Sequence, residues 1–377
     1  MSAPTVLQIV PTLDGGGIAR ATLDAAQATI AAGGTAIVAS PGGALVPELL
    51  RLRATHLELP AHRHPLWAGL TLPRKLAASL REAAVSVIHA RSAATAWLAR
   101  GLGARLGVKW IATLHVPFST TGLARRVLEA RQVSADGLIA VSQFVARNAQ
   151  ARFPQLDGRI EMIVPGVSVD RFDPALVRAD RLIRLANTLR VPDGSPIILC
   201  ANRFDEDNGQ AVLIEALKLL GQADVFCLLL GSQGAPTAFE KELERRIENA
   251  ELQGRVKIGP YVDDMPAAYM LADVVVATGG ARQGFSRTLI EAQAMGRPVI
   301  AEDGGGAAEA VVPGVTGWLA AAGDASALAE ALRSALSLST ERRAELARRA
   351  QEHARSRYDL ARCNRQLLDL YERMSTR

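Results

Sequence analysis

Short apolar runs alternate with helix-forming stretches along almost the whole chain, and this alternation restricts the fold more than any other feature. Runs such as TVLQIV (5–10), VSVIHA (85–90) and GLIAVS (137–142) place Val, Ile and Leu on successive positions. Parallel strands buried on both faces have this pattern, whereas strands with one wet face alternate apolar and polar residues. The alternation therefore predicts an α/β fold built from doubly wound, Rossmann-like sheets.

The alternation breaks once, in the turn-rich stretch 164–196, and then starts again with PIILCANR (196–203). A chain of 377 residues exceeds the size at which one core keeps growing, so two domains are expected. We predict an N-terminal Rossmann-like domain over 1–180 and a C-terminal one over 190–355. The stretch past Ala325 reads as almost continuous helix, and its last part, 356–377, is expected to complete the first domain.

The composition indicates an intracellular, cytoplasmic protein. The first residues lack a basic start followed by a long apolar stretch, and no run of 18 apolar residues occurs. Cys200 and Cys227 lie in strand-like runs, and no CxxC pair is present. His56, His62 and His64 stand beside prolines, and we interpret them as surface loop residues rather than as a metal site.

Positive charge is concentrated in the first half of the chain. Residues 1–150 hold 15 Lys and Arg against 7 Asp and Glu, while the remainder holds 28 against 31. A basic half suits an anionic partner, such as the inner face of the cytoplasmic membrane or a phosphorylated lipid. Scattered, solvated arginines would give the same count. Nucleic acid is not expected as a partner, because the basic residues are not interleaved with aromatics and no nucleic-acid motif is present.

Two glycine-containing turns precede helices and could bind anions. The first, Asp14–Gly17, follows the first strand-like run, and its glycines permit close backbone approach to a ligand. It lacks the spacing of a dinucleotide fingerprint, which argues against a nicotinamide-dependent dehydrogenase, and it could also be a plain tight turn. The second, Gly284, Phe285 and Ser286, opens a helix on which Glu291 lies two turns further on. Free N–H groups at such a helix start suit a diphosphate.

The stretch 282–311, RQGFSRTLIEAQAMGRPVIAEDGGGAAEAV, resembles the donor-binding region of glycosyltransferase family 4. Other similar pieces are GGGIAR (15–20), TLHVPF (113–118), PGVSVDRFDP (165–174) and GVTGWL (314–319). The resemblance implies the GT-B fold, two Rossmann-like domains facing across a cleft. It also implies a retaining glycosyltransferase with a nucleotide-sugar donor and no bound metal or other cofactor. The motifs are closest in style to bacterial enzymes of lipopolysaccharide and other envelope glycans.

Within the donor motifs the match is mixed. Arg203 corresponds to the family arginine on the diphosphate, and Glu291 to the glutamate that holds the ribose. Asn208 stands where the family has a lysine, Gln283 where it has its first glutamate, and Ser286 where it has the second glycine of a Gly-Phe-Gly turn. The lost lysine removes a full charge beside the leaving diphosphate, which Arg282 or Arg287 could restore.

In the first domain, His115 follows a strand and corresponds to the family histidine at the transfer centre, although capping a strand end is an alternative role. Gly16 and Gly17 are candidate ligand contacts, and His89 and Arg91 are candidates for the acceptor side. The expected reaction moves a sugar from a nucleotide diphosphate to an envelope glycolipid or oligosaccharide. The alternative is a non-catalytic glycosyltransferase-like binding or scaffold subunit, which the replacements at Asn208 and Gln283 would favour.

Overall fold

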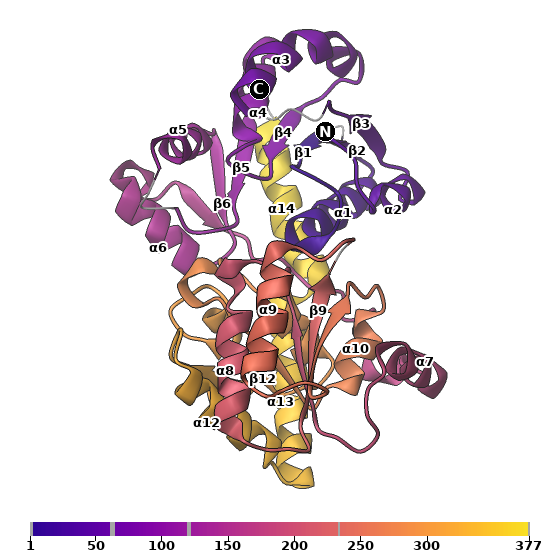
Figure 1. Ribbon diagram of the computed structural model, residues 1–377. Helices are drawn as coiled ribbons and strands as arrows, with labels where there is room; N and C mark the ends of the chain where they lie inside the picture. Colours follow the sequence, from indigo (N-terminus) through magenta and orange to yellow (C-terminus); the bar gives the residue numbers. More distant parts are fainter. Residues whose placement is uncertain (1–2, 61–64, 119–121, 233, 376–377) are drawn as a thin grey trace. The chain divides into compact units, whose positions relative to one another are not determined.

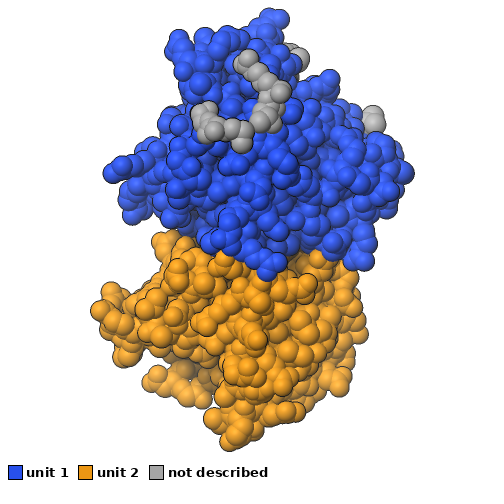
Figure 2. All heavy atoms as spheres, turned by 180° about the vertical axis from the view of Figure 1, so that it is seen from behind, with its two compact units in different colours: residues 1–166, 360–377 blue, residues 167–359 orange. Residues whose placement is uncertain are grey.

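The computed structural model describes residues 3–60, 65–118, 122–232 and 234–375 of the chain. It divides into two compact units, coloured separately in Figure 2. Unit 1 comprises residues 1–166 and 360–377, and unit 2 comprises residues 167–359. The chain therefore leaves unit 1 once and returns to it at its C-terminal end.

In unit 1, the described strands form one seven-stranded parallel sheet in the order β3-β2-β1-β4-β5-β6-β7 (Figure 1). Every neighbouring pair is parallel, and β1 lies between β2 and β4, with Val6 opposite Ala36 and Val87. The strands are β1 Thr5–Ile9, β2 Thr35–Ser40, β3 Thr55–Glu58, β4 Val87–Ala90, β5 Trp110–Leu114, β6 Gly137–Ala140 and β7 Ile160–Met162.

Seven helices of the described residues belong to unit 1. They are α1 Gly16–Ala31, α2 Val46–Arg51, α3 Pro65–Glu82, α4 Ala96–Leu106, α5 Leu123–Gln132, α6 Gln143–Arg152 and α14 Leu360–Ser375. The amphipathic helix α14 packs against α1 and β4, and its Leu367, Leu370 and Tyr371 are buried in one apolar cluster with Val6 and Val87. The last helix of the chain thus supplies part of the core of its first unit.

In unit 2, the described strands form a six-stranded parallel sheet in the order β10-β9-β8-β11-β12-β13. The strands are β8 Ile197–Ala201, β9 Phe226–Ser232, β10 Val256–Pro260, β11 Val274–Ala277, β12 Val299–Glu302 and β13 Gly317–Ala320. The helices are α7 Ala179–Leu189, α8 Gln210–Leu220, α9 Ala238–Asn249, α10 Met265–Leu271, α11 Arg287–Ala294, α12 Ala325–Leu336 and α13 Thr340–Tyr358. Polar N-caps start several of them; Thr237 and Glu240 form a reciprocal capping box on α9.

Both sheets are doubly wound, which confirms the fold class predicted from the apolar runs. The strand order reverses between β1 and β4 in unit 1 and between β8 and β11 in unit 2. The first domain was predicted to end at 180 and to resume at 356, whereas unit 1 ends at 166 and resumes at 360. The turn-rich segment after Gly166 belongs to unit 2, because the Val167 N–H donates to the Tyr358 carbonyl at 2.7 Å. Strand β13 was not foreseen as a strand.

Candidate functional site

The reversal between β8 and β11 places two loops side by side at the carboxyl edge of the sheet of unit 2. In doubly wound sheets this switch point is where ligands bind. The loop after β8 carries Arg203 and Asn208, and the loop after β11 carries Gln283. Gly209 allows the two loops to approach closely, since its φ is +68° and a Cβ there would lie 2.8 Å from the Gly279 nitrogen. The candidate donor residues are therefore brought together by topology.

Helix α11 begins directly after the Gly-Phe-Ser turn. Ser286 is its N-cap, and its Oγ accepts a hydrogen bond from the Leu289 N–H at 3.5 Å. The serine that replaces the expected glycine therefore satisfies one of the free N–H groups of the first turn. Phe285 anchors the turn, because its ring packs against Tyr358 at a centroid distance of 6.1 Å. The remaining N–H groups at this helix start retain the capacity to bind an anion.

Glu291 lies on α11 and is held by two neighbours within unit 2. Its Oε2 accepts from the Tyr269 hydroxyl at 2.8 Å, and its Oε1 lies 3.4 Å from the Arg287 Nε. Both charged side chains are largely buried, with 13% and 12% of their surface exposed. Burial, and secondarily Glu291, raise the pKa of Tyr269 well above its usual range, so the phenol stays protonated as a donor. The carboxylate is thus fixed in one orientation before any ligand arrives.

The cations around these loops are paired with carboxylates. Arg203 is 85% exposed and its Nη2 lies 2.8 Å from the Asp205 carboxylate. Arg282 is 70% exposed and forms an ion pair with Asp207. Exposed ion pairs are weak, on the order of 0–1 kcal/mol, so a phosphate could displace either carboxylate at little cost. Arg287 is different, because it is buried beside its carboxylate partner.

The two residues that depart from the family pattern contact each other. Gln283 donates from Nε2 to the Asn208 Oδ1 at 3.4 Å, and Asn208 donates from Nδ2 to the Arg203 carbonyl at 2.8 Å. The Thr278 hydroxyl also donates to the Asn208 carbonyl. A lysine and a glutamate at these positions would face each other as opposite charges. The chain has instead a pair of neutral amides, whose donor and acceptor groups match.

Glu302 is a member of this site that the sequence analysis did not single out. It ends β12 and is only 4% exposed, with Oε2 accepting from the Gly279 N–H at 2.8 Å and Oε1 from the Gly323 N–H at 3.4 Å. The glycine-rich segment just after Glu302 makes a second hydrogen bond to the same loop, because the Gly306 N–H donates to the Gln283 carbonyl at 2.8 Å. Glu302 therefore holds the loop that presents Gln283. The sequence did contain a pattern that could have identified Glu302: a glutamate at the end of an apolar strand-like run, shortly before three glycines.

In unit 1, the reversal between β1 and β4 places the first glycine turn at the carboxyl edge of the sheet, beside the end of β4. Gly15 and Gly16 have φ values of +133° and +81°, and a Cβ on Gly16 would meet no atom within 4 Å. Helix α1 starts at Gly16 without a side-chain cap. Gly16 and Gly17 thus lie at an open, uncapped helix start that a ligand can approach.

His115 follows β5 at the same edge. Its ring nitrogen Nε2 is shielded from solvent and has no hydrogen-bond partner among the described residues. Burial, and secondarily the positive charge of Arg91, lower the pKa of His115 to about 3. The imidazole is therefore neutral near pH 7, and it can exchange hydrogen bonds with a ligand without carrying a charge.

His89 and Arg91 lie inside unit 1 rather than on its surface. His89 is fully buried, with Nδ1 2.7 Å from the Tyr371 hydroxyl and Nε2 2.7 Å from the Thr113 hydroxyl. Burial and Arg91 lower the pKa of His89 well below its usual range. Arg91 is 4% exposed and donates from Nε to Gln8 at 2.9 Å. His89 thereby joins α14 to β5, whereas Arg91 holds β1 and α1, since its Nη2 also donates to the Ala21 carbonyl at 3.2 Å. Contact of these two side chains with an acceptor stays a prediction.

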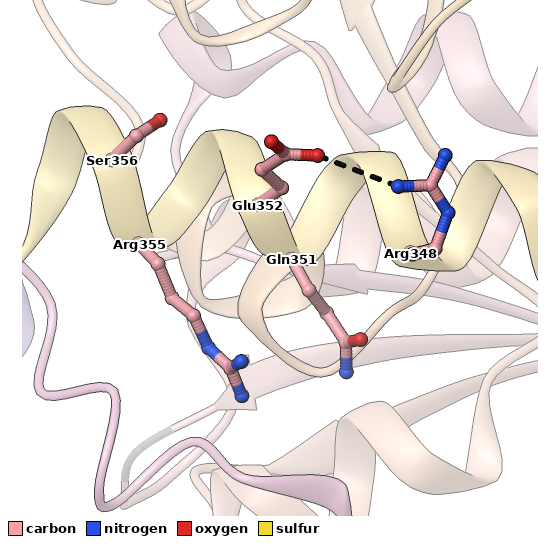
Figure 3. Close-up of a pocket in the computed structure, with 5 residues that line it drawn as sticks. All are labelled: Arg348, Gln351, Glu352, Arg355 and Ser356. Carbon is pink, nitrogen blue, oxygen red and sulfur yellow. Dashed lines mark ion pairs between the residues drawn. The ribbon is translucent and has the colours of Figure 1, made fainter.

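The remaining candidates among the described residues form no site. A hollow on unit 2 is lined by residues of α13 alone, and its Arg348 pairs with Glu352 (Figure 3). His56 lies in strand β3, not in a loop, and its Nε2 is 2.9 Å from the Ser40 hydroxyl, whereas His62 and His64 lie outside the described residues. Burial raises the pKa of Cys200 to about 12, so this thiol stays protonated.

Comparison with known proteins agrees with this arrangement. The family model of Glycosyltransferase Family 4 matches residues 15–171, and that of Glycosyl transferases group 1 matches residues 184–356. A D-inositol 3-phosphate glycosyltransferase of Salinispora arenicola is 30% identical over 84% of this chain and 73% of its own length. The chain belongs to glycosyltransferase family 4. The relatives of this family 4 chain also include a D-inositol 3-phosphate glycosyltransferase of Xylanimonas cellulosilytica, 34% identical over 67% of this chain.

This family 4 chain matches only 61% of the length of the Xylanimonas protein. Among solved structures, a glycosyltransferase from Rickettsia africae is 28% identical, with a TM-score of 0.89 and complete coverage of both chains. The HepE protein of Anabaena, solved in complex with UDP-glucose, is 23% identical, with a TM-score of 0.85 over 98% of this chain and 99% of its own. The two Rossmann-like units are thus those of the GT-B glycosyltransferases.

Proposed function

We propose that this chain is a retaining glycosyltransferase that moves a sugar from a nucleoside diphosphate to a hydroxyl group of an envelope glycolipid or oligosaccharide. The main support is the arrangement at the switch point of unit 2. There an exposed arginine, Arg203, and the start of helix α11 flank the loop that carries Gln283. A guanidinium and helix N–H groups are what a diphosphate requires.

In this proposal unit 2 binds the donor. Arg203 exchanges Asp205 for a phosphate oxygen, and the N–H groups that begin α11 bind the other phosphate. Glu291 accepts hydrogen bonds from the ribose hydroxyls, since a carboxylate has about four acceptor positions and two are used by Tyr269 and Arg287. Gln283 differs from a glutamate because its amide can also donate to the transferred sugar.

Unit 1 binds the acceptor, with the Gly16–Gly17 turn and His115 as its contacts. The low pKa of His115 means that it does not carry the proton of the acceptor hydroxyl as an imidazolium near pH 7. We assign that proton to the leaving diphosphate and give His115 a hydrogen-bonding role toward the sugar. This division follows from the family resemblance and from the chemistry of the two neutral groups, His115 and Gln283.

The names of the relatives suggest a further class of acceptor. Besides the D-inositol 3-phosphate glycosyltransferases, they include a GDP-mannose-dependent phosphatidylinositol monomannoside mannosyltransferase of Mycolicibacterium smegmatis, 31% identical over 62% of this chain. We therefore extend the proposal to acceptors that carry a phosphorylated polyol, either free or lipid-linked. These names do not favour lipopolysaccharide over other envelope glycans.

The test is nucleotide release from a panel of UDP- and GDP-sugars, with and without inositol phosphate or an acceptor lipid extract. Release that depends on one donor and rises with acceptor supports the transferase. The alternative, a non-catalytic binding subunit, has its support in the neutral pair of Asn208 and Gln283. Nucleotide binding without release from any donor, in the presence of acceptor, would favour that alternative.

A further inference from the structure

The positive surplus of the first 150 residues comes from one segment. Residues 65–132, which contain α3, α4 and α5, hold ten Lys and Arg against two Asp and Glu. The rest of residues 1–150 holds five against five. Eight of these ten cations lie on the three helices, so the surplus is concentrated there rather than scattered over unit 1.

These helices lie next to each other, since α3 packs on α4 and α4 packs on α5 (Figure 1). Of their two carboxylates, only Glu82 is exposed, because Glu129 is buried. We call the exposed cations of this layer the α3–α5 basic face. It consists of Arg74, Lys75, Arg81, Arg100, Arg105, Lys109, Arg125 and Arg126. Eight exposed cations thus stand against one exposed carboxylate.

Several members of the α3–α5 basic face have no neutralising neighbour. Arg125 pairs with Glu129 at 3.3 Å, and Arg81 donates to the Arg105 carbonyl at 3.0 Å. Among the described residues, four others make no ion pair or side-chain hydrogen bond: Arg74, Lys75, Arg100 and Arg126. Their charge is therefore available to an external anion.

Helix α13 of unit 2, which packs on α11, is also rich in arginine. Two of its arginines pair with glutamates one turn away: Arg348 and Arg349 both contact Glu345, at 3.3 and 2.5 Å. Arg348 also contacts Glu352, as Figure 3 shows. Such i, i+3 and i, i+4 pairs cancel the charge locally. The α3–α5 basic face lacks this pattern.

The chemistry of the face suits a lipid headgroup surface better than a nucleic acid. Val127 on α5 is 44% exposed beside Arg125 and Arg126, so apolar and cationic groups share the surface. The aromatic ring of Trp97 on α4 is covered by the Arg131 guanidinium, 4.3 Å from its centroid, and is not free to stack on bases. Single-stranded nucleic acid binding relies on such stacking, whereas anionic bilayers require only clustered cations and shallow apolar contacts.

We propose that the α3–α5 basic face docks unit 1 on an anionic membrane surface. This goes beyond the proposed transfer reaction, because it requires neither a bound donor nor turnover. A layer of three adjacent helices presents its cations over a broad area, which matches the spread of charge on a bilayer. Docking would keep the protein at the surface where lipid-linked acceptors lie.

The experiment is cosedimentation of the full chain with vesicles of phosphatidylcholine, with or without phosphatidylglycerol. The face variant R74Q/K75Q/R100Q/R126Q removes four cations that have no partner to lose. Each cation near an anionic leaflet contributes roughly a fivefold factor in partitioning at low salt, so the variant should bind at least about a hundredfold more weakly. Binding of the wild type should fall steeply with added salt.

The matched control is R342Q/R348Q/R349Q/R355Q, which removes the same charge from the exposed side of α13. It should bind like the wild type. The proposal is overturned if the wild type does not sediment with anionic vesicles, if both variants lose binding equally, or if binding ignores salt. It is also overturned if the face variant loses affinity for an oligonucleotide that the wild type binds more tightly than vesicles. Circular dichroism and melting temperature establish that each variant is folded.

Discussion

Arg282 is the residue whose removal tests the donor site most sharply. Its guanidinium is held by Asp207, the residue directly before Asn208, so its charge lies beside the position where the family has a lysine. We expect Arg282 to release Asp207 and bind the diphosphate in its place. Removal of one such charge contact commonly costs on the order of 2–4 kcal/mol, or 10²–10³ in rate. Arg282→Ala should therefore lower turnover by that factor.

A second change tests whether the charge itself matters. Asn208→Lys supplies a cation within the same loop, and Gln283 can turn its amide oxygen toward it. In the wild type this lysine should change turnover by less than about tenfold, because the charge is already supplied. In the Arg282→Ala background it should restore most of the lost activity. The assay is nucleotide release for all four proteins under one donor and acceptor.

Arg245 on α9 provides the control, since it is also 70% exposed and is paired with a carboxylate, Glu242. Arg245→Ala should leave turnover unchanged. The reasoning is refuted if Arg282→Ala costs no more than Arg245→Ala, or if Asn208→Lys raises the activity of the wild type by 10²-fold or more. The latter result would mean that the site lacks the charge that a lysine supplies.

Three further predictions concern individual side chains. Arg203→Ala should weaken nucleoside diphosphate binding by about 1.5–3 kcal/mol, and calorimetry showing equal affinity would remove Arg203 from the diphosphate site. Glu302→Gln presents an NH₂ group to one of two backbone donors and should lower the free energy of unfolding by about 1–3 kcal/mol, as urea titration would show. Because the pKa of His115 is about 3 when folded and about 6.5 when unfolded, the unfolded state binds the extra proton between these values. His115 therefore contributes a fall in the free energy of unfolding of up to about 1.4 kcal/mol per pH unit below pH 6.5, to which the buried His89 adds its own, and His115→Gln should reduce the slope by the first amount.

Much of the fold follows from the sequence because parallel strands buried on both faces leave an unambiguous apolar signature. In unit 2, for example, the apolar run of β8 is followed by helix α8, as the alternation predicts. Strand β13 was not predicted from the sequence because Gly317–Ala320 is short, begins with glycine and includes a half-buried Trp318. The unit boundary after Gly166 depends on a hydrogen bond to Tyr358, almost 200 positions away, which no local pattern encodes.

In the candidate site, too, the features set by neighbouring residues could be predicted, whereas contacts between residues far apart in the sequence could not. The Gly284–Ser286 turn and Glu291 are local motifs, and the structure places the turn directly before α11 and Glu291 on that helix. The contact of Gln283 with Asn208 joins residues 75 positions apart and depends on strand order. His89 and Arg91 were predicted on the acceptor side because they lie at the end of a strand. Their burial depends on Tyr371 and Gln8, which come from other parts of the chain.

The return of the chain to unit 1 has a consequence for biosynthesis. Unit 2 is one continuous segment, 167–359, and all of it is synthesised before the helix that completes unit 1. Unit 1 cannot close its core at that stage, because Leu367, Leu370 and the hydroxyl partner of His89 have not yet emerged. The first half of the chain to be made is therefore the last to be completed. A nascent chain stalled before α14 would expose an apolar groove and an unsatisfied histidine to chaperones and proteases.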